Sequence, residues 1–368
     1  MSTGVGAPRL EVCLDRIRHN AETLVRRLGE RGISVTGVTK ATLGSPEIAR
    51  ALLQAGVSSI GDARIENIEA LRRAGVPAVM TLIRSPMPSQ VDRVIEHADV
   101  SLNTEVAVVE QLSRAATRQH RHHGVVLMAE LGDLREGILP GDLAAAARRT
   151  LDLPNIVLRG IGTNLACQSG VAPDEHNMAD LSTLARSLES SLGVAFDIVS
   201  GGNSATLGWA LGGGDVGRIN DLRLGESILL GRETLGRTPI DGLHLDAVTL
   251  VVEVIESKAK PTQPWGDVHQ TAFGAQPAPA DRGTTCRTIL AIGRQDVDPD
   301  GLQAPVGCRV LGASSDHLVL DTGSTSPAPG AEMRFGLDYS ALLRAMTSPF
   351  VSRCFTGALA DVTGSTVG

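Results

Sequence analysis

Residues 14–233 alternate eight short apolar segments with segments that have helical spacing. The first strand is expected just before Lys40, where Ile33 and Val35 are apolar and β-branched, as in strands buried on both faces. The last strand is expected over Ile219–Leu224. This alternation predicts an α/β fold, the (β/α)8 barrel, although open doubly wound sheets share the pattern.

The pattern changes near Arg237. His244–Glu256 alternates apolar and polar residues as antiparallel strands do, and no convincing helix follows until Ser340–Met346. Lys258–Gly283 is rich in Pro, Gly and Ala and is expected to be a long loop. The sequence therefore predicts three parts: a barrel over residues 10–236, a smaller, mostly β domain over residues 237–355, and a disordered tail over residues 356–368.

Composition argues against several classes of protein. The net charge of −7 disfavours a surface for nucleic acid or for an anionic membrane, and no apolar run is long enough to span a bilayer. The first eight residues have no apolar signal-peptide core, and the five scattered cysteines are typical of reduced thiols. The histidine run His120–His123 has no accompanying carboxylate or cysteine, so a solvated loop is expected there rather than a metal site. We therefore expect a cytoplasmic protein that binds neither nucleic acid nor membrane.

Polar residues follow the expected strands at their carboxyl ends, where barrels carry their chemistry. Lys40 closes the first strand. Burying a lysine as a cation is costly, and desolvation is also what turns a lysine into a Schiff-base nucleophile. From this stretch alone, a lysine whose amine simply reaches solvent explains the pattern equally well.

Two further motifs stand at the ends of the seventh and eighth strands. SGGNS (Ser200–Ser204) combines glycines that allow close backbone approach with hydroxyl and N–H donors, so it indicates phosphate binding, with a tight turn as the alternative. Arg223 either pairs with Asp221 or Glu226 or faces a cofactor ring. Cys167 has no neighbouring base in the sequence and is expected to be a small apolar residue.

Several stretches share their order and spacing with one known family. They are Lys40 after the first strand, GDARIENI (Gly61–Ile68), GIGTNLACQSG (Gly160–Gly170), SGGNS, INDLRLGESILLGRET (Ile219–Thr234) and GASSDHLVLD (Gly312–Asp321). Together they resemble the fold-type III pyridoxal-phosphate (PLP) enzymes, the family of alanine racemase, and are most similar to its ornithine-racemase-like branch. The resemblance covers about residues 10–355.

The resemblance implies a PLP site at the barrel mouth. Lys40 would carry PLP as an internal aldimine, and Arg223 would face the pyridine nitrogen. Ser204 and neighbouring backbone would hold the phosphate, with the sole tyrosine of the chain, Tyr339, as a further phosphate contact. The remaining cofactor-binding residues that the resemblance implies are Asn164, Ser200, Gly202, Asn203, Gly225 and Glu226.

The resemblance also implies residues near the substrate. Arg135 falls near the family's arginine in the fifth-strand motif, and Asp316, beside Ser315, matches a residue near the substrate carboxylate that crosses a homodimer interface. Acidic residues in the C-terminal loops could pair with a side-chain ammonium of the substrate: Asp267, Asp296 and Asp298.

The chain departs from alanine racemases at three places. Leu43 and Gly44 stand near where a tyrosine follows the catalytic lysine, and Asn164 replaces the histidine that stacks on the cofactor ring. Arg294 stands where the second catalytic base, a tyrosine, is expected, and an arginine stays protonated and is a poor base. His269 and Cys286, in the loop expected before that strand, are the other candidates for a second proton carrier.

The chain is therefore expected to be a PLP-dependent racemase. It would remove the Cα proton from the external aldimine of a free amino acid, either alanine or a basic one such as ornithine or lysine. The alternatives are a PLP-binding protein without racemase activity and a D-amino-acid lyase of the same fold. That lyase needs a metal and a late His-x-Cys pair, whereas His317 is followed by Leu318 and Val319.

Overall fold

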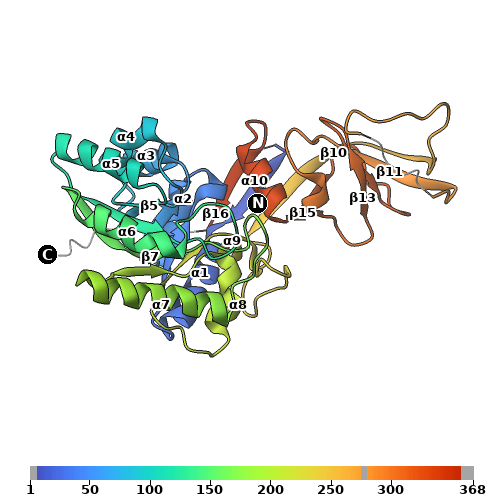
Figure 1. The fold of residues 1–368 in the computed structure, drawn as a ribbon. Coiled ribbons are helices and arrows are strands. Elements are labelled where there is room, and N and C mark those ends of the chain that lie inside the picture. Colours follow the sequence, from blue (N-terminus) through green and yellow to red (C-terminus); the bar gives the residue numbers. More distant parts are fainter. Residues whose placement is uncertain (1–5, 275–279, 358–368) are drawn as a thin grey trace. The chain divides into compact units, whose positions relative to one another are not determined.

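The computed structural model describes residues 6–274 and 280–357, which form two compact units (Figure 1). One unit spans residues 14–245. The other combines residues 6–13 with the described residues from 246 to 357.

The first unit is a closed barrel of eight parallel strands, which confirms the predicted fold class. Strand β9 pairs back onto β2, with Arg223 opposite Thr36, and this pairing closes the barrel. The barrel strands are β2 (Ser34–Val38), β3 (Ser59–Asp62), β4 (Met80–Leu82), β5 (Val100–Asn103), β6 (His123–Met128), β7 (Ile156–Gly162), β8 (Ile198–Ser200) and β9 (Asp221–Leu224).

Helices separate successive strands and cover the outside of the barrel (Figure 1). Their apolar stripes face the strands: in α1, for example, Ile17, Leu24 and Leu28 are fully buried. The helices are α1 (Leu14–Gly29), α2 (Pro46–Gln54), α3 (Ile65–Arg73), α4 (Val91–His97), α5 (Val106–Arg118), α6 (Pro140–Leu151), α7 (Glu175–Leu192), α8 (Leu207–Leu211) and α9 (Glu226–Leu230).

Every residue of strand β6 is buried, including its first residue, His123. A ring nitrogen of His123 lies 2.8 Å from Ser101 Oγ, and desolvation lowers the pKa of the imidazole to about 4. The expectation of a solvated loop over the histidine run is therefore wrong for His123, because His123 is already part of the strand.

The second unit is built on one mostly antiparallel sheet of eight strands. Its main path runs β12-β15-β10-β11-β14-β13, and β1 pairs with both β10 and β16. Its elements are β1 (Arg9–Cys13), β10 (Val248–Pro261), β11 (Thr284–Leu290), β12 (Leu302–Gln303), β13 (Arg309–Ala313), β14 (Leu318–Asp321), β15 (Glu332–Leu337), α10 (Tyr339–Thr347) and β16 (Ser352–Thr356).

The compact units differ from the expected boundaries at both ends of the barrel. Strand β1 joins the β unit, because Leu10 pairs with Leu250 and the buried Arg9 makes ion pairs with Glu11 (2.7 Å) and Glu332 (2.6 Å). The second junction falls between residues 245 and 246 rather than after 236. Thr356, expected in the tail, ends β16, and residues 358–368 lie outside the described residues.

Strand β10 is longer than the sequence indicates. It continues through Lys258–Pro261, which we expected in a loop, because β11 pairs with it as far as Pro261 opposite Thr284. Lys258 and Lys260 both pair with the Glu256 carboxylate in this segment. The described residues contain no helix that is long and apolar enough to cross a membrane.

Gly160 is a position where the barrel requires glycine. A Cβ there would overlap the Ile198 carbonyl oxygen of the neighbouring strand. We expect Gly160→Ala to lower the free energy of unfolding by about 2–4 kcal/mol, because backbone has to move to admit the methyl group. Urea denaturation followed by circular dichroism measures the change.

Gly193→Ala is the matched control. Gly193 ends α7 at φ +67°, and no atom lies within 4 Å of the position that an alanine methyl group would take, so the cost is conformational and about 1 kcal/mol. Equal losses in the two variants would contradict the close approach of β7 and β8.

Candidate active site at the barrel mouth

Lys40 stands at the carboxyl end of β2, where it begins one turn of 3-10 helix, Lys40–Thr42. Its side chain is solvent-accessible, yet it is surrounded by enough protein that desolvation lowers the pKa of its amine. The nearby charges of Arg135 and Arg223 act in the same direction, whereas Asp62 opposes them. The chain turns away directly afterwards at Gly44, where a Cβ would lie 2.7 Å from Asn67 Cβ.

Asp62 is the buried carboxylate beside this turn. It accepts hydrogen bonds from Thr39 Oγ1 (2.8 Å), the Arg64 backbone N–H (2.9 Å) and Asn67 Nδ2 (3.0 Å). Burial raises the pKa of its carboxyl group, against the effect of these three donors. Asp62 thus ties the segment that carries Lys40 to the start of α3.

Arg223 points from β9 into a buried polar chain that crosses three strands. Its Nη1 donates to Ser200 Oγ (2.5 Å), and Ser200 donates to Asp221 Oδ2 (2.5 Å). Asp221 Oδ1 accepts a further bond from Thr36 Oγ1 (2.8 Å). Burial raises the pKa of Asp221 and lowers that of Arg223, which stays a cation because an arginine keeps its proton in proteins.

These contacts bear on one of the two alternatives that the sequence left open for Arg223, the pairing with Asp221 or Glu226, whereas the cofactor ring stays a prediction. The guanidinium reaches Asp221 only through the hydroxyl of Ser200, and Glu226 pairs with Arg237 at 2.7 Å instead. Arg223 Nη2 donates to the Thr163 carbonyl (2.9 Å) and to Asn164 Oδ1 (3.2 Å). The guanidinium is therefore held at the mouth by several fixed contacts.

SGGNS forms the turn between β8 and a 3-10 turn, Ser204–Thr206. Gly202 has φ +118°, and a Cβ there would lie 2.8 Å from Thr206 Oγ1. Ser204 Oγ lies 3.0 Å from Ser227 Oγ and accepts the Ser227 backbone N–H at 3.3 Å. Gly225, just before α9, is also cramped, since a Cβ would lie 3.1 Å from Val38 Cβ.

Asn164 connects Arg223 with the SGGNS turn. Its Oδ1 accepts from Arg223 Nη2 and from Asn203 Nδ2, both at 3.2 Å. Its Nδ2 is buried and has no hydrogen-bond partner. Buried donors are rarely left unsatisfied, so an orphaned amide at this position indicates room for an acceptor from a bound group.

Cys167 is exposed and its Sγ lies 3.3 Å from Asn203 Nδ2. The sequence-based expectation of a small apolar residue is therefore wrong. Its neighbours in sequence gave no signal, because its partner is 36 residues away along the chain. The loop between β7 and α7 brings the two together.

Asp133 is a second residue whose role the sequence alone did not indicate. This buried carboxylate accepts the backbone N–H groups of Cys167 (3.2 Å), Gln168 (2.9 Å) and Ser169 (3.0 Å). Burial acts to raise the pKa of Asp133, but the backbone donors outweigh it and the net pKa is lowered. Arg135, two residues on, pairs with Glu136.

The remaining predicted site residues lie in the β unit. Asp296 is buried and accepts Ser348 Oγ at 2.7 Å, whereas Ser315 and Asp316 are exposed and bonded to each other at 3.2 Å. Tyr339 is the first residue of α10. Their expected contacts with cofactor or substrate stay predictions.

The three candidates for a second proton carrier differ in their surroundings. His269 is exposed in the segment after β10, and Arg294 lies with its guanidinium 5.2 Å from the ring centre of Phe273. We expected Cys286 in a loop, but it lies inside β11, and its Sγ is 3.3 Å from Ser257 Oγ. That hydrogen bond is the largest influence that lowers the pKa of the Cys286 thiol.

Comparison with known proteins identifies relatives along nearly the whole chain. Residues 12–232 match the family profile described as alanine racemase, N-terminal domain. The chain is 38% identical to the lysine racemase of Thermotoga maritima, covering 95% of this chain and 98% of the relative. It is 36% identical to the ornithine racemase of Acetoanaerobium sticklandii, covering 94% and 99%.

Solved structures share the fold at lower identity. An alanine racemase from a D-cycloserine-producing Streptomyces lavendulae matches with a TM-score of 0.75 and 20% identity, covering 96% of this chain and 98% of that one. A D-threonine aldolase from Filomicrobium marinum matches with a TM-score of 0.74 and 14% identity, covering 93% and 89%. At these identities the likeness shows a common fold.

The hold of Asp133 on the loop after β7 can be tested directly. Asp133→Asn replaces one accepting oxygen by an NH2 group that faces backbone donors, so we expect a loss of about 1–3 kcal/mol in unfolding free energy. Limited proteolysis should also show faster cleavage within residues 163–170. Asp180→Asn, an exposed change on α7, is the control and should stay within about 0.5 kcal/mol of the parent protein.

Proposed function

Since this chain belongs to the alanine racemase family, we propose that it is a PLP-dependent racemase of a free amino acid. The observation that carries the proposal is the placement of Lys40, a lysine of lowered pKa at the end of the first barrel strand. It lies in a chain that is 38% identical to a lysine racemase over nearly its full length.

The residues at the barrel mouth fit PLP. Lys40 supplies an accessible amine for covalent attachment, and Gly202 and Gly225 clear the backbone around Ser204 for a phosphate. Arg223 supplies a fixed cation, and the unpartnered Nδ2 of Asn164 supplies a donor beside it. When bound, PLP acts as an electron sink that makes the Cα proton of an amino acid removable.

The chain's own residues account for one half of the proton transfer. Lys40, as the neutral amine, takes or returns the Cα proton on one face, and desolvation favours the neutral form that this role needs. Arg223 cannot give up its proton and so keeps a positive charge in place. Racemisation also needs a second proton carrier on the opposite face, for which His269, Cys286 and Arg294 are our candidates.

We propose a basic amino acid as the substrate, on the strength of the lysine and ornithine racemases among the relatives. Two of the three carboxylates that we expect to pair with the side-chain ammonium of the substrate already accept hydrogen bonds from serine hydroxyls. Asp296 accepts Ser348 Oγ at 2.7 Å, and Asp298 accepts Ser340 Oγ at 2.5 Å. Asp267 is exposed in the segment after β10.

We further propose a homodimer in the cytoplasm. The family resemblance, in which Asp316 serves the partner's site, supports the dimer. The five free cysteines support a reducing compartment. Light scattering after gel filtration distinguishes a dimer from a monomer of 38.4 kDa.

Two other functions remain open to test. The D-threonine aldolase match shows that a lyase can have this fold, and the described residues contain no group of three or more His, Cys, Asp or Glu side chains placed to hold a metal. A lyase would release an aldehyde, and its activity would follow added divalent metal. A protein that only binds PLP would release no product and change no chirality.

The racemase proposal predicts a chirality change that depends on Lys40. Holoenzyme incubated with L-lysine, L-ornithine or L-alanine should produce the D-form, as followed by chiral chromatography. Lys40→Ala should lower kcat by at least about 1,000-fold, because both attachment and one proton carrier are lost. Lys258→Ala, an exposed lysine of the β unit, should retain parent activity. Bound cofactor without racemisation of any amino acid would refute the proposal.

The lowered pKa of Lys40 predicts its reactivity in the cofactor-free protein. The chain has only three lysines, Lys40, Lys258 and Lys260, so amine labelling can be resolved by peptide mass spectrometry. Because desolvation disfavours the ammonium, we expect the labelling rate of Lys40 to reach half its maximum below pH 10.4, roughly the ordinary pKa of lysine. A half-maximal labelling rate at or above that pH would contradict the proposal that Lys40 acts as a base.

Solvent deuterium separates a two-base racemase from a one-base remnant. A racemase incorporates deuterium at Cα as it inverts the centre, whereas a protein with Lys40 alone exchanges the proton without inversion. We expect one variant among His269→Gln, Cys286→Ser and Arg294→Lys to keep exchange but lose inversion by roughly 100-fold. If all three invert at the parent rate, the second proton carrier is a different residue.

A further inference from the structure

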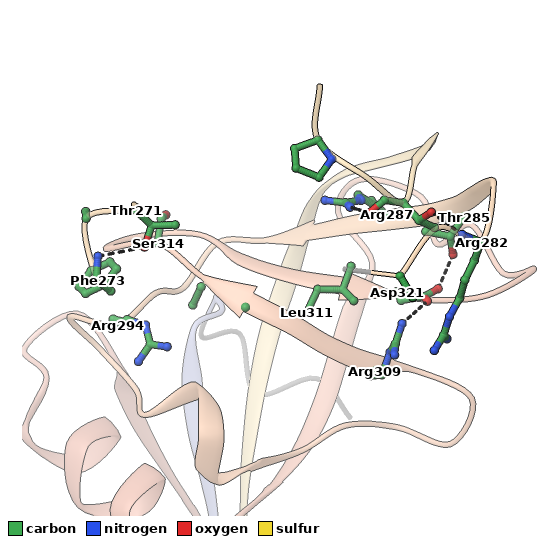
Figure 2. A pocket seen from close by; sticks show the side chains of 16 residues that line it. Thr271, Phe273, Arg282, Thr285, Arg287, Arg294, Arg309, Leu311, Ser314 and Asp321 are labelled. Atoms are coloured by element: carbon green, nitrogen blue, oxygen red, sulfur yellow. Dashed lines mark hydrogen bonds and ion pairs between the residues drawn. The ribbon is translucent and has the colours of Figure 1, made fainter. Parts of the chain in front are cut away.

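The β unit contains a pocket of about 560 Å³ (Figure 2), and of its described lining residues Arg294 is the one that the racemase proposal also names, as a candidate proton carrier. It lies between the segment that follows β10 and the strands β11 and β13. Its volume is in the range of small-molecule sites. All of its described lining residues belong to the β unit.

The pocket is elongated along β13. Arg309 opens this strand at one end and pairs with Asp321 at 3.2 Å. At the other end, the Arg294 backbone N–H donates to the carbonyl of Ser314, the residue after the strand. Ser314 follows Arg309 by five positions, which in an extended chain is roughly 16 Å. Leu311 lies between the two ends, as Figure 2 shows.

The lining carries an excess of positive charge. Four arginines line the pocket, and Asp321 is the one carboxylate among the described lining residues. Asp321 is already engaged by Arg309, by the Gly323 N–H (3.0 Å) and by Thr285 Oγ1. Arg287 donates to the neutral carbonyl of Thr262 (2.9 Å). The end that holds Arg309 therefore keeps a net positive charge.

The opposite end also holds a cation that is poorly neutralised. Arg294 stacks on Phe273, and the carboxylate it approaches, Asp300, is 4.0 Å away and 84% exposed. Moreover, Nε of both Arg294 and Arg287 is buried without a hydrogen-bond partner. Buried donors are rarely left without acceptors, and a guanidinium pairs most strongly with an anion, so an anion beside Arg287 and Arg294 would supply the acceptors that are missing.

We propose that this pocket binds an organic dianion, with one anionic group facing Arg294 and the other facing Arg282 and Arg287. The wall between them is apolar, formed by Leu311 and Ala313, so the two groups should be joined by an apolar chain. A linear dicarboxylate meets this description, and a phosphate ester of a carboxylic acid has the same chemistry. The same charges exclude a diamine.

Isothermal titration of the PLP-loaded protein tests the proposal. The probes are linear dicarboxylates of four to eight carbons, with hexanoate as the single-anion control and 1,6-diaminohexane as the cationic control. We expect at least one dicarboxylate to bind at least tenfold more tightly than hexanoate, with affinity that falls as salt rises, and no binding of the diamine. Inorganic phosphate and phosphonohexanoate distinguish a phosphate from a carboxylate group.

Variants at both ends show where the probe binds. Arg282→Gln, Arg287→Gln and Arg294→Gln should each weaken the best dicarboxylate at least tenfold, and Arg287→Lys should weaken it less than Arg287→Gln. Circular dichroism confirms that each variant is folded, and Arg282, exposed on the loop, is the change least able to disturb the sheet.

The proposal is overturned if no dicarboxylate binds more tightly than about 10 mM, if hexanoate binds equally well, or if the glutamine variants bind like the parent protein. Its failure is separate from that of the racemase proposal. Repeating the titration with Lys40→Ala should leave the dicarboxylate affinity unchanged, because Lys40 belongs to the barrel unit.

Discussion

A cation buried at the mouth of a closed barrel is the constraint on which the rest of the candidate site depends. Arg223 has too little water around it to be solvated, so protein groups on three neighbouring strands must hold its charge. Ser200 accepts a hydrogen bond from Arg223 and donates one to the Asp221 carboxylate. That carboxylate also accepts a hydrogen bond from Thr36, on the strand that leads to Lys40. The polar chain therefore crosses the place where β9 and β2 close the barrel.

The same hydrogen-bonded network links the segment that carries Lys40 to the SGGNS turn. SGGNS begins at Ser200, and Lys40 lies four residues beyond Thr36, so both are anchored to one hydrogen-bonded network. Asn164 and Asp133 extend the hold to the loop after β7. Donors held in place in this way are preorganised, which supports the anionic cofactor that we propose.

The two units use charge in opposite ways. In the barrel, buried Arg223 and Asp221 neutralise each other through a shared hydroxyl. In the β unit, the arginines around Leu311 outnumber the carboxylates among the described lining residues, and two of their Nε atoms lack partners. An excess of this kind is costly to fold, and a bound anion is the ordinary way in which proteins offset it.

The sequence by itself determined eight strands alternating with helices, because buried parallel strands need near-continuous apolar segments, and these repeat visibly between residues 14 and 233. The pairing of β9 with β2 decided that the sheet closes into a barrel rather than staying open. The sequence also determined which residues stand at the carboxyl ends of strands, since Lys40 and SGGNS follow apolar runs and Arg223 falls near the end of the last expected strand. The separate β domain was evident from the change to alternating segments. These features are local in the chain, and local patterns can be recognised without coordinates.

Only the tertiary structure decided which residues that are distant in the sequence contact each other. Strand β1 belongs to the β unit because Leu10 meets Leu250, 240 residues away, and no local pattern records such a pairing. Cys167 lies at the mouth because Asn203 and Asp133 hold its loop, although its neighbours in sequence offer it no base. Pairings between distant residues are set by packing and hydrogen bonding across the fold, and a single sequence does not state them.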